Sequence, residues 1–145
     1  MDARDEAREA REALEQIAAT RRTTARRVAS PKGYYALAGT GVGLVVLGLG
    51  LDGWVRWVLY VIGLLTALGA MQWYTRHTGA VAWATLREPG AWRAWLMAAI
   101  SFVAMGVAFF GPLPAAVAAV VTAASWAVLG PAWDADWVRS IEEQP

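Results

Sequence analysis

The side chains that could do chemistry inside the apolar parts of this chain are few and uncharged. They are threonines, serines and one glutamine: Thr40, Thr66, Gln72, Ser101, Thr122 and Ser125. Hydroxyl groups in such segments usually bond to a carbonyl one turn earlier in their own helix. Ion-coupled transport needs an ionisable group or unwound polar backbone near the bilayer centre. These residue types therefore favour helix packing over catalysis or proton-coupled transport.

Other patterns for catalysis or ligand binding are missing from the sequence. The chain has no cysteine, which excludes thiolate metal sites and a cysteine nucleophile. Its one histidine, His77, has no second candidate ligand beside it and is expected to contact lipid headgroups. The run Gly39–Gly43 lacks the lysine of a phosphate-binding loop. We therefore expect no enzyme activity, no metal and no cofactor.

Four long apolar blocks hold most of the 57% hydrophobic content of the 145 residues. They cover residues 34–51, 55–74, 94–110 and 113–133. A block of 18 helical residues reaches about 27 Å, close to the hydrocarbon thickness of a bilayer. The sequence predicts an all-α membrane protein with four transmembrane helices. Turn signals at Asp52-Gly53 and 111–114 predict two hairpins within the bundle 34–133.

Prolines and glycines predict where the bundle begins and ends. Pro31-Lys32-Gly33 separates a charged head, residues 1–30, from the first block, and we expect a hinge at 31–33. Gly130-Pro131 predicts the end of the last helix, since proline disrupts the helical hydrogen-bond ladder. Residues 134–145 are then expected to form a short cytoplasmic tail.

Basic residues predict the orientation of the chain in a bacterial plasma membrane. Five of them closely precede the first block: Arg21, Arg22, Arg26, Arg27 and Lys32. Because short cytoplasmic segments are enriched in Lys and Arg, this pattern places the N-terminus in the cytoplasm. Four spans return the C-terminus to the same side. We expect these five residues to contact anionic headgroups, and nucleic acid is an unlikely partner.

The nine tryptophans lie mainly at the predicted ends of the blocks, and only Trp126 falls inside one. Indole prefers the membrane interface, because its ring is apolar and its N–H is polar. We interpret the tryptophans as interfacial anchors, with a ligand cage as the alternative.

The head has the heptad spacing of an amphipathic helix, but its stripe is mostly alanine. Leu14 and Ile17 are its large apolar members and the candidate partner-binding residues. The alternatives are a solvated helix near the membrane and a helix that binds a partner or pairs with itself. In the first block, Gly39 and Gly43 share one helix face and are candidates for close helix packing, within the chain or between two copies.

The head resembles that of small multi-span membrane proteins of actinobacteria. The matching residues are Glu12-Ala13-Leu14, Ile17 and Ala19-Thr20-Arg21-Arg22. The resemblance implies an accessory or regulatory membrane protein, and it carries over no functional residue.

Three functional hypotheses follow from this pattern. The first is a non-enzymatic membrane scaffold or accessory subunit that recruits a membrane or cytosolic protein through its head. The second is an oligomeric small transporter or channel component. The third is a lipid-binding or membrane-shaping protein.

Overall fold

The computed structural model describes residues 8–9, 11–17, 19–20, 23, 30–79 and 90–142. Residues 141 and 142 are described as backbone only. The described head residues between 8 and 23 are helical and exposed, whereas Ser30 is non-helical and partly buried. Four helices follow: α2 (Tyr34–Leu49), α3 (Gly53–Thr78), α4 (Ala91–Ala108) and α5 (Pro112–Glu142). The described parts contain no strand, so the predicted all-α class is confirmed for them.

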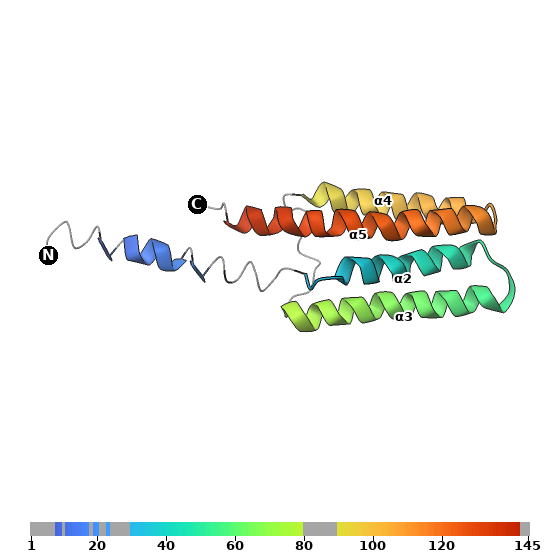
Figure 1. Cartoon of the computed structure of the whole chain (residues 1–145), viewed down its shortest axis with the longest axis horizontal. Helices are drawn as coiled ribbons and strands as arrows, with labels where there is room; N and C mark the ends of the chain where they lie inside the picture. The colour runs from blue at the N-terminus through green and yellow to red at the C-terminus, as the bar shows by residue number, and fades with distance from the viewer. Residues whose placement is uncertain are drawn as a thin grey trace.

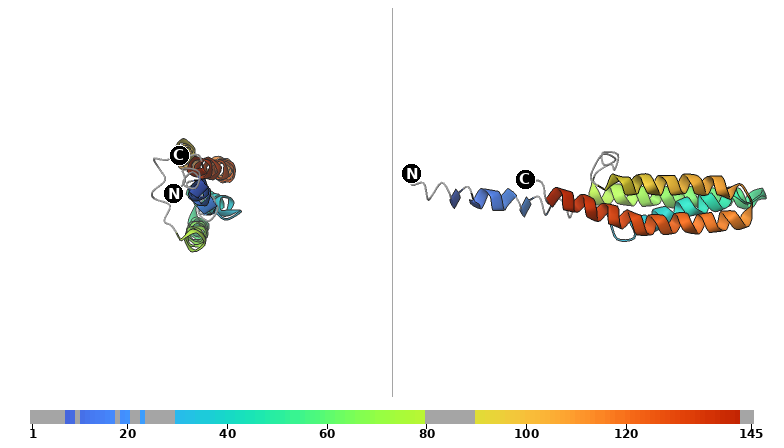
Figure 2. Two further views of the ribbon diagram at one scale, coloured as in Figure 1. Left: turned by 90° about the vertical axis from the view of Figure 1, so that its left-hand side faces the viewer. Right: turned by 90° about the horizontal axis from the view of Figure 1, so that it is seen from above.

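The four helices form two antiparallel hairpins that lie side by side (Figure 1). Helix α2 packs along both α3 and α5, and α4 packs along α5. Helices α3 and α4 share almost no contact. The order across the bundle is therefore α3, α2, α5, α4, and the end-on view shows this arrangement as an open arc (Figure 2).

Three of the helices, α3, α4 and α5, are long and apolar enough to cross a membrane. Helix α2 is apolar but has only 16 residues, or about 24 Å. The predicted block 34–51 was too long, because the chain turns after Leu49. There the amides of Gly50 and Leu51 donate to the carbonyls of Leu47 and Gly48 at 3.2 and 3.3 Å, which tightens the last turn.

The prediction that Gly130-Pro131 ends the last helix was wrong, since α5 continues through Pro131 to Glu142. Contacts from other parts of the chain hold the extension. Ser30 bonds to Asp134, and Arg93 bonds to the carbonyl of Ala132 and pairs with Asp136. These contacts offset the single hydrogen bond that proline removes from the ladder. The predicted tail 134–145 thus begins as helix.

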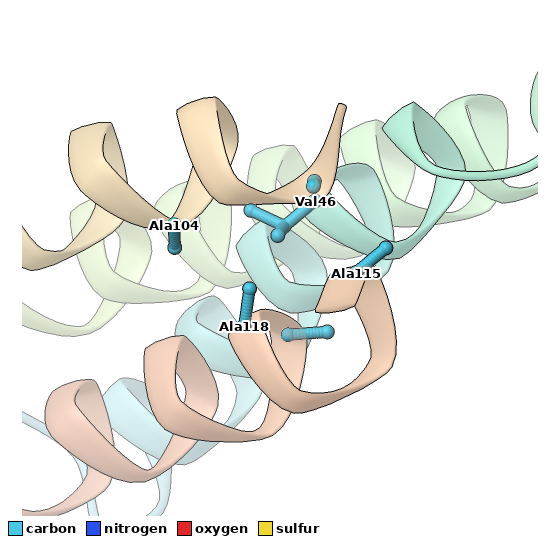
Figure 3. Packing of buried hydrophobic residues seen from close by; sticks show 6 residues of the cluster. Val46, Ala104, Ala115 and Ala118 are labelled. Carbon is cyan, nitrogen blue, oxygen red and sulfur yellow. The ribbon is translucent and has the colours of Figure 1, made fainter. Parts of the chain in front are cut away.

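A cluster of buried hydrophobic residues lies toward the end of the bundle where both hairpins turn. Val46 of α2 reaches between α4 and α5 and is fully buried (Figure 3). The rest of this cluster consists of alanines from α4 and α5: Ala104, Ala108, Ala115, Ala118 and Ala119. Such small side chains bring the helix backbones close together, as is typical of membrane helix interfaces.

Glycine lets α2 occupy the centre of the arc. A Cβ on Gly39 would stand 2.5 Å from the Cβ of Trp126 on α5, and one on Gly43 would stand 2.9 Å from the Ala119 carbonyl oxygen. On the opposite face, a Cβ on Gly41 would stand 2.8 Å from the carbonyl oxygen of Gly63 on α3. The short helix therefore approaches two neighbours at backbone distance.

Candidate functional site

A cavity of about 260 Å³ lies at the other end of the bundle, where α2 and α4 begin. All four helices contribute to its lining. The lining residues are Tyr34, Tyr35, Tyr74, Ala94, Met97, Ala98, Trp126, Trp133, Asp134 and Trp137. Six of these ten side chains are aromatic, and we call this space the aromatic cavity. It is the most aromatic region of the described bundle.

The antiparallel arrangement explains why three tyrosines meet there. Tyr34 and Tyr35 open α2, and Tyr74 lies near the end of α3, which runs back beside α2. The ring centroids of Tyr34 and Tyr35 are 4.9 Å apart, and those of Tyr34 and Tyr74 are 5.0 Å apart. These distances fall in the favourable range for aromatic pairs, so the three rings support one another.

Gly130 brings Tyr35 close to α5. A Cβ on Gly130 would collide with the Cβ, Cγ and Cδ1 atoms of Tyr35, so the ring lies against the backbone of α5 at this residue. One turn further along, α5 carries Trp133 and Asp134 into the cavity lining. The glycine read as a helix terminator in the sequence is therefore a packing site for a cavity residue.

Among the described residues, Asp134 is the one charged residue that lines the aromatic cavity. The backbone N–H of Ser30 donates to its Oδ2 at 2.8 Å, and the Ser30 hydroxyl donates to its Oδ1 at 3.2 Å. The Ser30 hydroxyl also lies 3.4 Å from the hydroxyl of Tyr35. Asp134 thus ties the segment before α2 to the end of α5, although none of the ion pairs among the described residues includes it.

A second polar cluster stands beside the cavity and pairs its own charges. Arg93, near the start of α4, forms an ion pair with Asp136 and donates to the Ala132 carbonyl oxygen at 2.9 Å. Arg139 lies 3.9 Å from the other oxygen of Asp136. The guanidinium carbon of Arg93 also lies 5.1 Å from the centroid of the Trp92 ring. This cluster joins α4 to α5 and leaves Asp134 as the separate carboxylate.

Two indole N–H groups near the cavity differ in their hydrogen bonding. Trp126 donates from Nε1 to the Ser101 hydroxyl at 3.1 Å, and Ser101 itself donates to the Met97 carbonyl oxygen at 2.8 Å. The Nε1 atom of Trp133 is buried and has no acceptor in the described part of the chain. The cavity lining therefore includes an indole donor that no group in the described part of the chain satisfies.

The sequence-predicted site residues fall into three groups. Leu14 and Ile17 are exposed on the head helix, and Figure 1 shows that helix apart from the bundle. Gly39 and Gly43 face α5 within the same chain. Lys32 is exposed on the turn before α2, whereas Arg21, Arg22, Arg26 and Arg27 lie outside the described residues. The structure does not bring these groups together.

The turn at the predicted hinge 31–33 has defined hydrogen bonding. The amide of Tyr34 donates to the carbonyl oxygen of Pro31 at 3.0 Å. Gly33 has φ of 88°, a conformation that glycine adopts without strain.

The described tryptophans fall into two groups by position. Trp54, Trp57, Trp73, Trp92 and Trp95 are exposed on the outside of α3 and α4. Trp57 and Trp73 are separated by about 24 Å along α3, so they suit the two interfaces of one bilayer. Trp126, Trp133 and Trp137 instead line the cavity. Trp83 lies outside the described residues.

Sequence reasoning missed the cavity because its charged member was assigned to a tail. The pattern Trp133-Asp134 followed by Trp137 has helical spacing, which could have indicated a shared face if the helix had been extended past Pro131.

No family model, curated protein or solved structure matches the chain. The resemblance of the head therefore stays an expectation.

Proposed function

We propose that this protein is a non-enzymatic membrane scaffold that recruits a helical segment of another protein through its head. The observation that carries the proposal is the exposure of Leu14 and Ile17, which are 66% and 48% exposed on the head helix. Large apolar side chains on a charged, solvated helix gain free energy when a partner covers them. The small residues on the same stripe favour close approach by another helix.

The bundle serves as the anchor in this proposal. Helices α3, α4 and α5 cross a bacterial plasma membrane, and α2 completes a fourth, shorter span. Support for α2 comes from its glycine-lined contacts with α3 and α5, both of which are long apolar helices. A short span is accommodated by local thinning of the bilayer. The positive-inside pattern places the head, the aromatic cavity and the C-terminus on the cytoplasmic side.

The packing of α2 bears on the alternative of an oligomeric transporter or channel component. That alternative drew on the glycines of the first block as contacts between copies. Gly39 and Gly43 instead lie against Trp126 and Ala119 of the same chain. Their small faces are therefore used within the protomer, which favours the scaffold.

The test is crosslinking in native membranes with a matched pair of double variants. Leu14→Ala with Ile17→Ala removes the two apolar side chains, and alanine preserves the helix. Glu9→Ala with Glu12→Ala removes two exposed side chains from the opposite face and is the control. We expect the first variant to lower capture of a discrete partner by about tenfold, or about 1.4 kcal/mol of binding free energy.

The control variant should capture the partner as the wild type does. Equal loss in both variants would assign the effect to the head as a whole and reject the Leu14–Ile17 surface. Crosslinks only between copies of this chain, dependent on Leu14 and Ile17, would replace recruitment by self-pairing. No partner with the wild-type head would contradict the scaffold.

A further inference from the structure

The aromatic cavity combines two features that recognise positive charge. Its lining includes Tyr34, Tyr35, Tyr74, Trp133 and Trp137, and Asp134 supplies the one charged group among the described lining residues. Aromatic faces attract cations through their negative quadrupole, and the attraction strengthens where water is excluded. A carboxylate beside such rings adds a full negative charge at the same place.

The Asp134 carboxylate has no positively charged partner among the residues that the structure describes. Its side chain is partly buried, and its hydrogen bonds come from Ser30, a neutral residue. A carboxylate has about four lone-pair positions, so two bonds leave acceptor capacity. Arg93 and Arg139 interact with Asp136 instead. Lys32 lines a neighbouring hollow with Asp134, but no ion pair joins them in the described part of the chain.

We propose that the aromatic cavity binds an organic ammonium ion, with Asp134 as its counter-charge and the tyrosine and tryptophan rings around its alkyl groups. The volume of the cavity fits this class of ligand. At about 260 Å³ it is many times the volume that a single water molecule needs, and it suits a group such as trimethylammonium. Much of the lining is apolar, including Met97 and Ala94. Strongly hydrated metal cations prefer oxygen ligands, so such a cation is not the preferred ligand of this cavity.

A neutral or anionic ligand fits the same lining less well. An anion would approach the Asp134 carboxylate, and the lining residues that the structure describes include no Lys or Arg to offset the repulsion. A neutral ligand would leave the partly buried charge without compensation. The proposal is independent of the head, because Leu14 and Ile17 take no part in the cavity.

The ammonium group has two possible sources, a free small molecule and a lipid headgroup. The cavity lies between the beginning of α2 and the end of α5, next to the exposed tryptophans Trp92 and Trp95 of α4. Exposed indoles mark the headgroup level of a bilayer. A lipid ammonium and a soluble one would therefore both reach this level of the protein.

The test compares choline with its uncharged carbon analogue, 3,3-dimethylbutan-1-ol. The two molecules have the same shape and differ in the central nitrogen, so the comparison isolates the charge. The full chain in an uncharged detergent is titrated with each by calorimetry, with sodium chloride as the ionic blank. We expect choline to bind with a Kd of roughly 1 mM or tighter, at least about tenfold tighter than the alcohol.

A lipid arm separates the two sources of the ammonium. The protein is placed in nanodiscs that contain phosphatidylethanolamine and phosphatidylglycerol, and native mass spectrometry identifies the retained lipid. Choline binding in the first arm indicates a free small cation. Selective retention of phosphatidylethanolamine without choline binding indicates the lipid headgroup. Neither choline binding nor ethanolamine-lipid retention would overturn the proposal.

Variants test the assignment of Asp134. Asp134→Asn keeps an oxygen that can accept from Ser30 and removes the charge, and it should weaken ammonium binding at least about tenfold. Asp52→Asn makes the same change at a 99% exposed side chain at the other end of the bundle and should change affinity by less than about twofold. Equal affinity of wild type and Asp134→Asn would overturn the assignment. If Asp134→Asn does not fold, equal binding of choline and the alcohol to the wild type, together with no selective retention of phosphatidylethanolamine, overturns it instead.

Discussion

The two ends of the bundle differ in the size and type of the side chains between their helices. At the end where both hairpins turn, Val46 and five alanines fill the space between α2, α4 and α5 (Figure 3). At the other end, six aromatic side chains surround a cavity of about 260 Å³. We refer to these as the alanine end and the aromatic end. Helices α2, α4 and α5 contribute to both ends, so the difference lies largely in their side chains.

The comparison teaches how a small membrane bundle can combine rigidity with a binding space. Alanine and glycine let helices touch at backbone distance, where dispersion contacts are dense and little can move. At the aromatic end, large rings line a cavity between the helices instead. Polar contacts then replace close packing there: Ser30 bonds Asp134, and Arg93 pairs with Asp136.

The largest effect is expected from added volume at the alanine end. Gly43→Val places a side chain where a Cβ already meets the Ala119 carbonyl oxygen at 2.9 Å. Backbone cannot move aside as a flexible side chain does, so we expect a loss of about 3 kcal/mol in the free energy of unfolding. Reversible unfolding in mixed micelles with increasing SDS measures this change.

Two variants test whether the loss is specific to tight packing. Gly69→Val makes the same substitution in α3, where a Cβ would meet no atom within 4 Å, and it should be neutral or slightly stabilising. Ala94→Val adds volume to the lining of the aromatic cavity and should cost less than about 0.5 kcal/mol. A similar loss in all three variants would contradict the distinction between the two ends.

A smaller effect is expected from the polar contacts of the aromatic end. Arg93→Gln removes the ion pair with Asp136. The side chain of Arg93 is 23% exposed and that of Asp136 is 27% exposed. Exposed ion pairs contribute up to about 1 kcal/mol to stability, and breaking a buried pair costs about 3–5 kcal/mol. The exposure of this pair is intermediate, so its contribution should lie between these values. We expect a loss of about 1–2 kcal/mol, concentrated in α5 after Pro131. Hydrogen exchange should show faster exchange of the amides at 133–140.

Arg56→Gln provides the matched control for this prediction. Arg56 also pairs with an aspartate and donates to a backbone carbonyl, at Asp52 and Leu51, but at the other end of the bundle. It should leave the exchange of residues 133–140 unchanged. Unaltered exchange there in Arg93→Gln would show that the helix continues past Pro131 without help from α4.

Much of the fold could be predicted from the sequence because it follows from local patterns. The apolar blocks have the length and composition of membrane helices, and Asp52-Gly53 is a turn signal that the structure also uses. The helix ends were less predictable. Pro131 disfavours a helix locally, but the contacts that overcome it come from Ser30 and Arg93, which are distant in sequence.

The aromatic cavity could not be predicted because its residues come from four helices. Tyr34, Tyr74 and Trp137 each look like an interfacial anchor when taken alone. They become a binding site only after α2 and α5 pack through glycine, which fixes how the arc closes. The proposed partner-binding residues Leu14 and Ile17, by contrast, need no tertiary structure for their identification, because a helical stripe is a local feature.

The smallest effect is expected from the contact that closes the aromatic end. Ser30→Ala removes the hydroxyl that donates to Asp134 at 3.2 Å and preserves the backbone N–H that donates at 2.8 Å. The hydroxyl's longer contact with the Tyr35 hydroxyl, at 3.4 Å, is lost as well. Because both contacts are long and the carboxylate keeps its shorter backbone donor, the free energy of unfolding should fall by about 0.5–1 kcal/mol. The same SDS titration measures it, with Ser140→Ala as the control, since that hydroxyl bonds only within its own helix turn. A loss as large as that of Gly43→Val would show that the aromatic end, rather than the alanine end, limits the stability of the bundle.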